Sequence, residues 1–408
     1  MPIYITNNHA SGLKCLGILV VLAMAWPAAA QPAPGQVTYS AGQGAQFSSA
    51  DGQDALGLSA RIALRETATL VEDNLRTETQ VKTVRLWLRG RQGGSEQEAP
   101  LTWLIQLAVG GRDHEADSPT PLFDAWVRWR AHRDVQVQVG QWFVPFDRAR
   151  TVREFALQLV DRPLAVRELT LDRDAGLAVM SDDLLGLGGK VLYRLGVFGG
   201  EGRNRFAPAG YPKGPLAVGR VELRPFGPFD ADVEGDAERL PSLRLAVGLA
   251  AAQGWSSLRV RGTTGGDFAG GATVDYRWWV ADLTAKWRGL SLLAEVVERQ
   301  QVGASAAVGR ASGIGAVVQG GAMLSEHLEL AGRWTRLWPR GSADQTAVQS
   351  PLQAQAGHEL GAGLNWYLLG HKRKLQLDAQ QSWNTSDGTA LGGKDGKLLV
   401  RLAVDMTF

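Results

Sequence analysis

The dominant pattern in this sequence is a strict alternation of apolar and polar positions with a period of two. At the C-terminal end, one face of an extended strand would carry Leu398, Val400, Leu402, Val404, Met406 and the terminal Phe408. The opposite face would carry Arg401, Asp405 and Thr407. A strand that closes a transmembrane β-barrel needs one lipid-facing and one water-facing side. The alternative for this segment is the last strand of a soluble β-sandwich.

The same alternation recurs along the chain and predicts about sixteen strands. The segments are 56–65, 84–89, 101–109, 123–130, 135–139, 174–181, 189–199, 216–225, 242–253, 272–288, 290–300, 312–323, 327–337, 357–369, 372–384 and 396–408. A tilted strand of about ten residues is long enough to cross the hydrocarbon layer. The sequence therefore predicts an all-β fold, a transmembrane antiparallel β-barrel of about sixteen strands over residues 55–408.

The start of the chain predicts export. An apolar run from Leu16 to Ala25 is followed by an A-x-A-type cleavage site before Gln31. The run is about ten residues long, well short of the roughly twenty that a spanning helix requires. We expect a signal peptide over residues 1–30, cleaved near Ala30. The single cysteine, Cys15, lies inside it, so the exported chain is expected to lack disulfides and cysteine-ligated metals.

Composition supports a barrel and argues against a nucleic-acid partner. Hydrophobic residues make up 45% of the chain, with 50 Gly and 14 Trp, yet after the signal peptide they are interleaved with polar residues. The net charge is only +2, and no clustered basic run is present. Residues 31–54, ahead of the first predicted barrel strand, are expected to form a periplasmic N-terminal lead segment.

Several short motifs occur in a characteristic order. They are Asp124-Ala125-Trp126, Val139-Gly140-Gln141 followed by Pro145-Phe146, Asp161-Arg162-Pro163, Arg173-Asp174-Ala175-Gly176 and Leu364-Asn365-Trp366-Tyr367. This succession resembles the phosphate-selective porin O/P family of bacterial outer-membrane porins. The resemblance implies a sixteen-stranded channel in the bacterial outer membrane, trimeric, surrounded by lipid and lipopolysaccharide, with a loop folded into the lumen. It also implies small anions such as phosphate as the solutes.

The stretch from Pro145 to about Arg173 is the candidate for this constriction loop. It is long, interrupts the alternation and is dense in charged residues. A plain surface loop would also be charged, so this alternative stays open.

Arginine dominates the basic residues, and a file of guanidinium groups along a wet lumen would favour anions over cations. The candidate lumen and constriction contacts are Arg61, Arg85, Arg89, Arg128, Arg130, Arg148, Arg150, Arg153, Arg162, Arg220, Lys286 and Arg333. Acidic residues share the water-facing phase at about half the frequency. Opposed Arg and Glu rows can stiffen a wall without selecting, so a weakly selective general porin and a structural or adhesive barrel remain alternatives.

The sequence offers little for an enzyme. His358-Glu359 does not continue as H-E-x-x-H, and His114 has no recognisable serine partner nearby. The glycine-rich patches at 186–189 and 265–271 lack the lysine and hydroxyl residue of a phosphate-binding loop. We therefore expect a passive diffusion channel with no catalytic activity, no cofactor and no metal.

Overall fold

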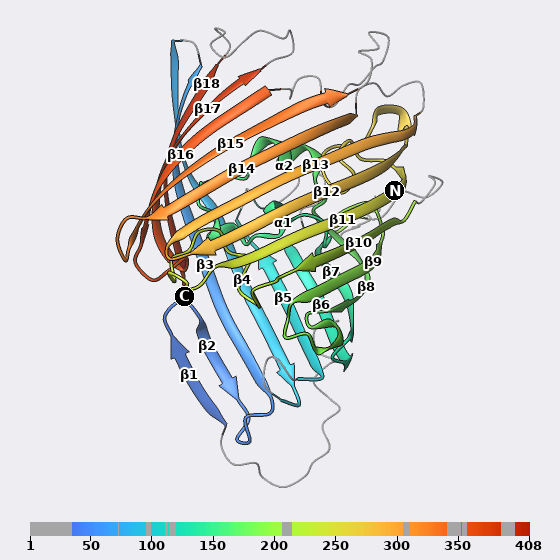
Figure 1. Cartoon of the computed structure of the whole chain (residues 1–408), viewed down its shortest axis with the longest axis vertical. Helices are drawn as coiled ribbons and strands as arrows, with labels where there is room; N and C mark the ends of the chain where they lie inside the picture. The colour runs from blue at the N-terminus through green and yellow to red at the C-terminus, as the bar shows by residue number, and fades with distance from the viewer. Residues whose placement is uncertain are drawn as a thin grey trace, which may run out of the picture.

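A computed structural model describes residues 35–71, 73–94, 99–110, 113, 120–205, 214–304, 311–340, 352, 357–384 and 396–408 (Figure 1). The predicted signal peptide, residues 1–30, lies outside the described residues.

Sixteen strands form the wall of a closed barrel, as the sequence predicted. Each strand pairs antiparallel with the next, and the last pairs with the first. The strands are β3 (Ala55–Val71), β4 (Asn74–Gln92), β5 (Leu101–Ala108), β6 (Leu122–His132), β7 (Val135–Phe143), β8 (Arg173–Ser181), β9 (Val191–Phe198), β10 (Leu216–Leu223), β11 (Arg244–Ser257), β12 (Val274–Trp287), β13 (Leu290–Ala304), β14 (Ser312–Met323), β15 (Leu328–Arg340), β16 (Gly357–Tyr367), β17 (Arg373–Asn384) and β18 (Lys397–Thr407).

The two ends of the chain's barrel region close the ring. The register runs from Lys397 opposite Val71 to Thr407 opposite Arg61. The terminal Phe408 donates its backbone N–H to Ala60 O at 2.8 Å and accepts from Ala60 N at 3.2 Å. The ring therefore has no free edge at this seam, as a barrel in hydrocarbon requires.

The distribution of apolar and polar side chains in the barrel is the reverse of that in a soluble protein. On β18, Leu402 is 48% exposed and faces outward, whereas Arg401 is 2% exposed and faces the interior. The same division holds on the long wall, where Leu292 and Val296 of β13 are exposed and Glu295 between them is buried. Apolar outside and polar inside is the arrangement of a transmembrane barrel.

Two strands precede the barrel and extend its sheet. β1 (Gln36–Ser40) and β2 (Gly44–Ser48) form a hairpin, and β2 pairs with the start of β3 through Ala45 opposite Leu58. The hairpin projects from one end of the barrel in Figure 1.

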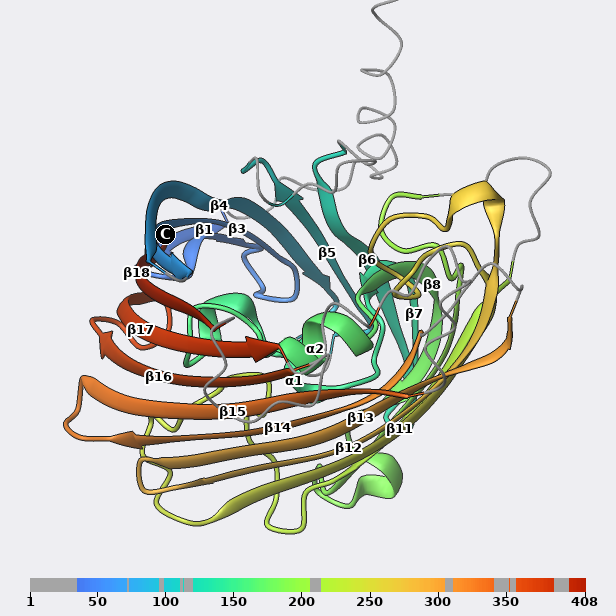
Figure 2. The same ribbon diagram turned by 90° about the horizontal axis from the view of Figure 1, so that it is seen from above.

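The long connection between β7 and β8, residues 144–172, is called the inner segment below. It contains the short helices α1 (Arg148–Thr151), η2 (Glu154–Ala156) and α2 (Leu164–Leu169). Figure 2 shows α1 and α2 within the ring of strands. The remaining helical turns, η3 (Leu184–Gly186) and η4 (Ala269–Gly271), lie in connections elsewhere. In the described part of the chain, no helix has the length and apolarity needed to cross a membrane.

The lipid-facing position of Leu402 gives a test of the barrel's orientation. Leu402→Arg is expected to destabilise the folded barrel in phospholipid bilayers by about 2–4 kcal/mol, because a guanidinium would be placed in hydrocarbon. Equilibrium urea unfolding in vesicles measures the change, with Leu402→Ala as the control for lost packing. An arginine variant no less stable than the alanine variant would contradict the assigned face.

Candidate functional site

The inner segment is attached to the barrel wall at its first helix. Asp147 caps α1 by accepting a hydrogen bond from the backbone N–H of Arg150. Glu295 of β13 accepts from the backbone N–H of Ala149 at 3.0 Å. The N-terminus of α1 is therefore held by a carboxylate of its own segment and by one from the wall.

Inward glycines on the wall make room for the second helix and for the residues that precede it. A Cβ added at Gly315 of β14 would lie 2.5 Å from the Ala165 Cβ, and one at Gly361 of β16 would lie 2.5 Å from the Leu159 side chain. Next to these glycines, Ala165 and Val166 of α2 pack in one buried cluster with Val317 of β14. The glycine-rich sequence of β14 thus lets α2 lie directly against the strand backbone.

Between the helices, polar wall side chains bind the backbone of the inner segment. Lys374 Nζ donates to Leu157 O at 2.6 Å, and Asp378 accepts from Val160 N at 2.9 Å. The Gln158 side chain donates to Glu329 at 2.6 Å. The inner segment is therefore fastened to β15 and β17 as well as to β13 and β14, and it fills this side of the lumen.

Two adjoining cavities, with four lining residues in common, remain on the opposite side, between the inner segment and β3–β8. The first, of about 780 Å³, lies towards the end that carries the connection 258–273, and we call it the loop-side cavity. The second, of about 810 Å³, lies towards the β1–β2 hairpin, and we call it the turn-side cavity. Both are lined by Trp87, Leu104, Arg153 and Phe155, which mark the junction between them.

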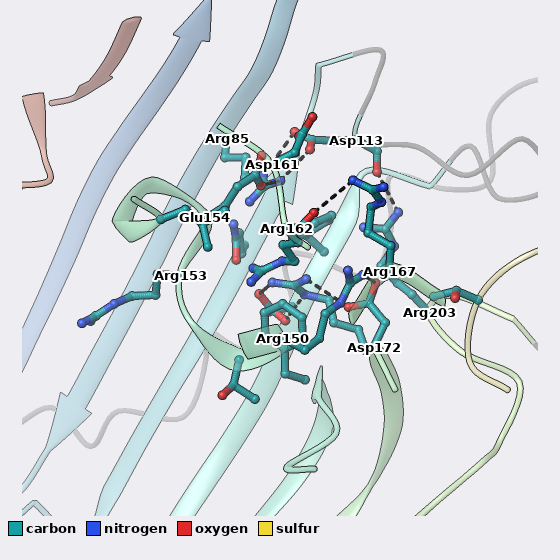
Figure 3. A pocket seen from close by; sticks show the side chains of 18 of the residues that line it. Arg85, Asp113, Arg150, Arg153, Glu154, Asp161, Arg162, Arg167, Asp172 and Arg203 are labelled. Atoms are coloured by element: carbon teal, nitrogen blue, oxygen red, sulfur yellow. Dashed lines mark hydrogen bonds and ion pairs between the residues drawn. The ribbon is translucent and has the colours of Figure 1, made fainter. Parts of the chain in front are cut away.

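The loop-side cavity carries an excess of basic side chains (Figure 3). Its basic lining residues are Lys82, Arg85, Arg150, Arg153, Arg162, Arg167, Arg173, Arg203, Arg259 and Arg261. Its acidic lining residues are Asp113, Asp124, Glu154, Asp161 and Asp172. All five of these carboxylates form ion pairs with arginines. Asp161 is bound by Arg65 and Arg401, each at 2.7 Å, and neither of those arginines lines the cavity.

Among the residues that the structure describes, Arg162 of this cavity has no carboxylate partner. Arg162 donates only to backbone carbonyls, to Ala149 O at 2.6 Å and to Val152 O at 2.7 Å. Burial lowers the pKa of Arg162 to about 10, and the neighbouring Arg150 charge lowers it as well. The group stays charged at neutral pH, and its charge is not offset by a direct ion pair.

A β-bulge adds an aromatic ring to the lining. The alternation over residues 123–130 predicts that Phe123 shares the apolar, lipid-facing side of its strand with Ala125 and Val127, opposite Asp124, and for Phe123 this prediction is wrong. The register between β5 and β6 shifts so that Asp124 pairs with Gln106 while Phe123 is skipped, and both side chains are buried. The Arg85, Arg173 and Arg203 guanidinium carbons lie 4.2, 3.9 and 4.3 Å from the centre of the Phe123 ring.

The structure divides the twelve candidate residues into two groups. Six line one or both cavities: Arg85, Arg89, Arg128, Arg150, Arg153 and Arg162. Six line neither: Arg61, Arg130, Arg148, Arg220, Lys286 and Arg333.

Most of the second group belongs to packed contacts rather than to the passage. Arg220 binds Asp282 at 2.6 Å and also donates to Phe146 O of the inner segment at 2.9 Å. Arg333 donates to Asp161 O at 2.7 Å. These inward arginines are covered because the inner segment lies on top of them, and this could not be read from strand alternation alone.

Sequence reasoning did not select several basic residues that line the cavities. They are Lys82, Arg91, Arg167, Arg173, Arg203, Arg259, Arg261 and Lys372. Arg167 and Arg173 lie within the charged stretch that the sequence did mark. Arg203, Arg259 and Arg261 lie in connections where no periodic pattern indicates direction. Among the residues that the structure describes, no group of three or more His, Asp or Glu side chains is placed to hold a metal ion.

The chain is similar to solved outer-membrane proteins over most of its length. A loop L8 deletion mutant of OmpT, an outer membrane protein of Vibrio cholerae, superposes with a TM-score of 0.55 at 10% identity, covering 86% of this chain and 99% of that one. The anion-selective porin from Comamonas acidovorans gives 0.55 at 12%, covering 87% and 100%. The outer membrane channel DcaP of Acinetobacter baumannii gives 0.53 at 12%, covering 89% and 99%.

These likenesses establish the fold, which is that of the porin-type outer-membrane β-barrels. No protein-family model matches the chain, and no curated protein matches its sequence. The resemblance to the phosphate-selective porin O/P family therefore stays a prediction that depends on the motifs.

The close contact between Gly315 of β14 and Ala165 of α2 gives a test of how the inner segment fills the lumen. Gly315→Leu is expected to displace α2 from β14, because even a Cβ at this position meets Ala165 at 2.5 Å. A displaced inner segment should change single-channel conductance and increase current noise in planar bilayers. Gly332→Leu is the matched control, because a Cβ at Gly332 meets no atom closer than 3.9 Å. Identical currents in both variants would contradict the packing of α2 against Gly315.

The cap of α1 gives a pH test. Burial raises the pKa of the Asp147 carboxyl from 3.8 to about 7. The folded segment therefore favours the neutral carboxyl, and this contribution is complete below the unfolded pKa and declines as the pH rises through 7. We expect the amides of residues 148–152 to lose hydrogen-exchange protection as the pH rises from about 4 to about 7, with no further loss above that, after correction for intrinsic rates. Asp147→Asn should remove this dependence, and an unchanged profile would contradict the assignment.

Proposed function

We propose that this protein is an outer-membrane porin that lets small hydrophilic solutes diffuse passively, with a preference for anions such as phosphate. The observation that carries the proposal is the loop-side cavity, where ten basic side chains face five carboxylates that are already ion-paired. The guanidinium groups of the lining can donate hydrogen bonds to an anion that enters the passage. The five carboxylates of the described lining are already ion-paired, so they attract a cation less.

The turn-side cavity supports the same preference. Its charged lining residues are Arg89, Arg91, Arg128, Arg153, Lys372 and one acid, Asp232. A solute therefore meets a positive excess on both sides of the junction. The proposed function involves no cofactor, no catalytic step and no nucleic acid.

A weakly selective general porin is the second candidate, and a specific observation favours it. Many wall arginines are neutralised locally, as in the Arg61–Asp405 and Arg401–Asp378 pairs. Such pairs hold the wall together and add little net field to the lumen. The two candidates differ in how strongly the remaining positive charge acts on ions in the passage.

We propose that the barrel forms a homotrimer surrounded by outer-membrane lipid and lipopolysaccharide, and the uneven height of its wall supports contact between copies. β9 and β10 have 8 residues each, whereas β12 and β13 have 14 and 15. At about 3.3 Å per residue and a tilt of about 45°, eight residues cover only about 19 Å of a roughly 25 Å apolar band. Leu195 and Val197 of β9 nevertheless face outward and are exposed. Contact with another copy would cover this short, apolar wall.

Reversal potentials across a KCl gradient in planar bilayers test the proposal. The wild-type protein should give stepwise conductance and a chloride-to-potassium permeability ratio above one. At about 0.1 M salt, an anion about 8 Å from a guanidinium gains about 0.25 kcal/mol and a cation loses as much, which together change the permeability ratio by a factor of about two. Arg162→Gln should therefore lower the ratio about two-fold, and added phosphate should reduce the chloride current.

Arg130→Gln is the matched control, because Arg130 is an inward arginine that lines neither cavity. A ratio at or below one in the wild type would refute the anion preference. The absence of stepwise conductance would refute the channel itself.

A further inference from the structure

A second connection enters the lumen from the opposite end of the barrel. Between β10 and β11 the chain runs from residue 224 to 243, while the neighbouring connection between β12 and β13 is only 288–289. Its central part, residues 229–240, is called the turn-end segment here. Ala231, Glu234 and Asp236 in it are 2%, 5% and 2% exposed. A plain surface turn would not bury an alanine and two acidic side chains.

The turn-end segment pairs with the backbone of the inner segment. Arg153 N donates to Asp232 O at 3.1 Å, and Glu234 N donates to Ala156 O at 3.1 Å. Between these bonds, Val233 packs against the buried cluster of Val152, Ala156 and Leu157. The two segments, which come from opposite ends of the barrel, therefore meet as a short backbone-paired unit at η2.

The wall holds the turn-end segment in place. Lys286 Nζ donates to Asp230 O at 3.0 Å, and Gln319 donates to the Glu234 carboxylate at 2.6 Å. Asp236 accepts from Gly289 N at 2.7 Å. These contacts come from β12, β14 and the β12–β13 turn, so the segment is fixed independently of the inner segment.

Two ion pairs join the segments at the passage. Asp232 binds Arg148, and Asp230 binds Arg153. Arg153 lines both cavities, and the Arg153 and Asp230 side chains are 46% and 54% exposed. Both side chains of the pair are therefore accessible to water. Arg153 lies where the two cavities adjoin, and Asp230, which lines neither cavity, acts there through its pair with Arg153.

We propose that the turn-end segment is the second half of the constriction, and that Asp230 and Asp232 are specificity-determining residues that set the charge and position of Arg153 at the junction. The inference rests on the proposed function as a channel. Asp230 offsets the Arg153 charge and limits the attraction that an anion meets there. Asp232 holds the segment to Arg148 and, through its backbone, holds η2 in place.

Asp230→Asn tests the electrostatic part. The substitution leaves the Arg153 charge unpaired and should raise the chloride-to-potassium permeability ratio about two-fold in planar bilayers. Asp134→Asn is the control, because Asp134 pairs with Arg133 at 2.9 Å and neither member of that pair lines a cavity, whereas the partner of Asp230, Arg153, lines both. An Asp230→Asn ratio that moves no further than the control would overturn the inference. An anion ratio above one in the wild type would show at the same time that the proposed function stands.

A cysteine at the same position keeps the inference testable if the asparagine variant folds poorly. With Cys15 replaced by serine, Asp230→Cys carries the only thiol of the chain. A negatively charged methanethiosulfonate reagent should restore the wild-type ratio, and a positively charged one should raise it. Opposite shifts support the inference. Equal currents with both reagents, or no modification, would overturn it.

Discussion

Water is absent from the hydrocarbon layer, and this constraint decides the rest of the structure. A backbone N–H or C=O facing lipid must be paired within the protein, so the sheet has to close on itself. The pairing of β18 with β3, completed by the bonds between Ala60 and Phe408, provides that closure. In a closed barrel every second side chain of a strand points inward. The charged side chains, which would be unstable in lipid, therefore occupy these inward positions.

Collecting charge inside creates a second requirement, since a buried charge must find a partner. The inner segment supplies many of these partners. Arg148 binds Glu222, and Asp161 binds Arg65 and Arg401, so wall charges are satisfied and the segment is fixed by the same contacts. The passage that remains is displaced towards β3–β8. Its excess positive charge comes from the basic side chains that remain after charged groups of the wall and of the inner segment have formed ion pairs with each other.

The sequence predicted the strands and their faces well, because a lipid-facing wall enforces a period of two. Arg401 and Asp405 face inward and Leu402 faces outward, as expected. The ends of β3 and β4 were missed, because residues 66–83 are mostly polar on both faces and give no alternation. Phe123 was placed on the wrong side, because a bulge shifts the register by one residue without a local signal.

The lining of the passage was only partly predictable, because it depends on contacts between segments distant in the chain. Nothing in the sequence distinguishes Arg220 from Arg162. In the structure Arg220 is ion-paired with Asp282, whereas Arg162 lines the loop-side cavity and has no carboxylate partner among the described residues. The turn-end segment was missed because a connection carries no periodic pattern. Its role follows from its contacts with η2, which only the three-dimensional arrangement reveals.

The displaced passage is the central claim, and cysteine accessibility tests it most directly. Leu104 lines both cavities, whereas Val317 also points inward but is 1% exposed beneath the inner segment. Leu104→Cys should react with a water-soluble thiol reagent and lose current in planar bilayers, while Val317→Cys should stay unmodified. Equal reaction at both positions would show that the lumen is open across its whole width and would contradict the account.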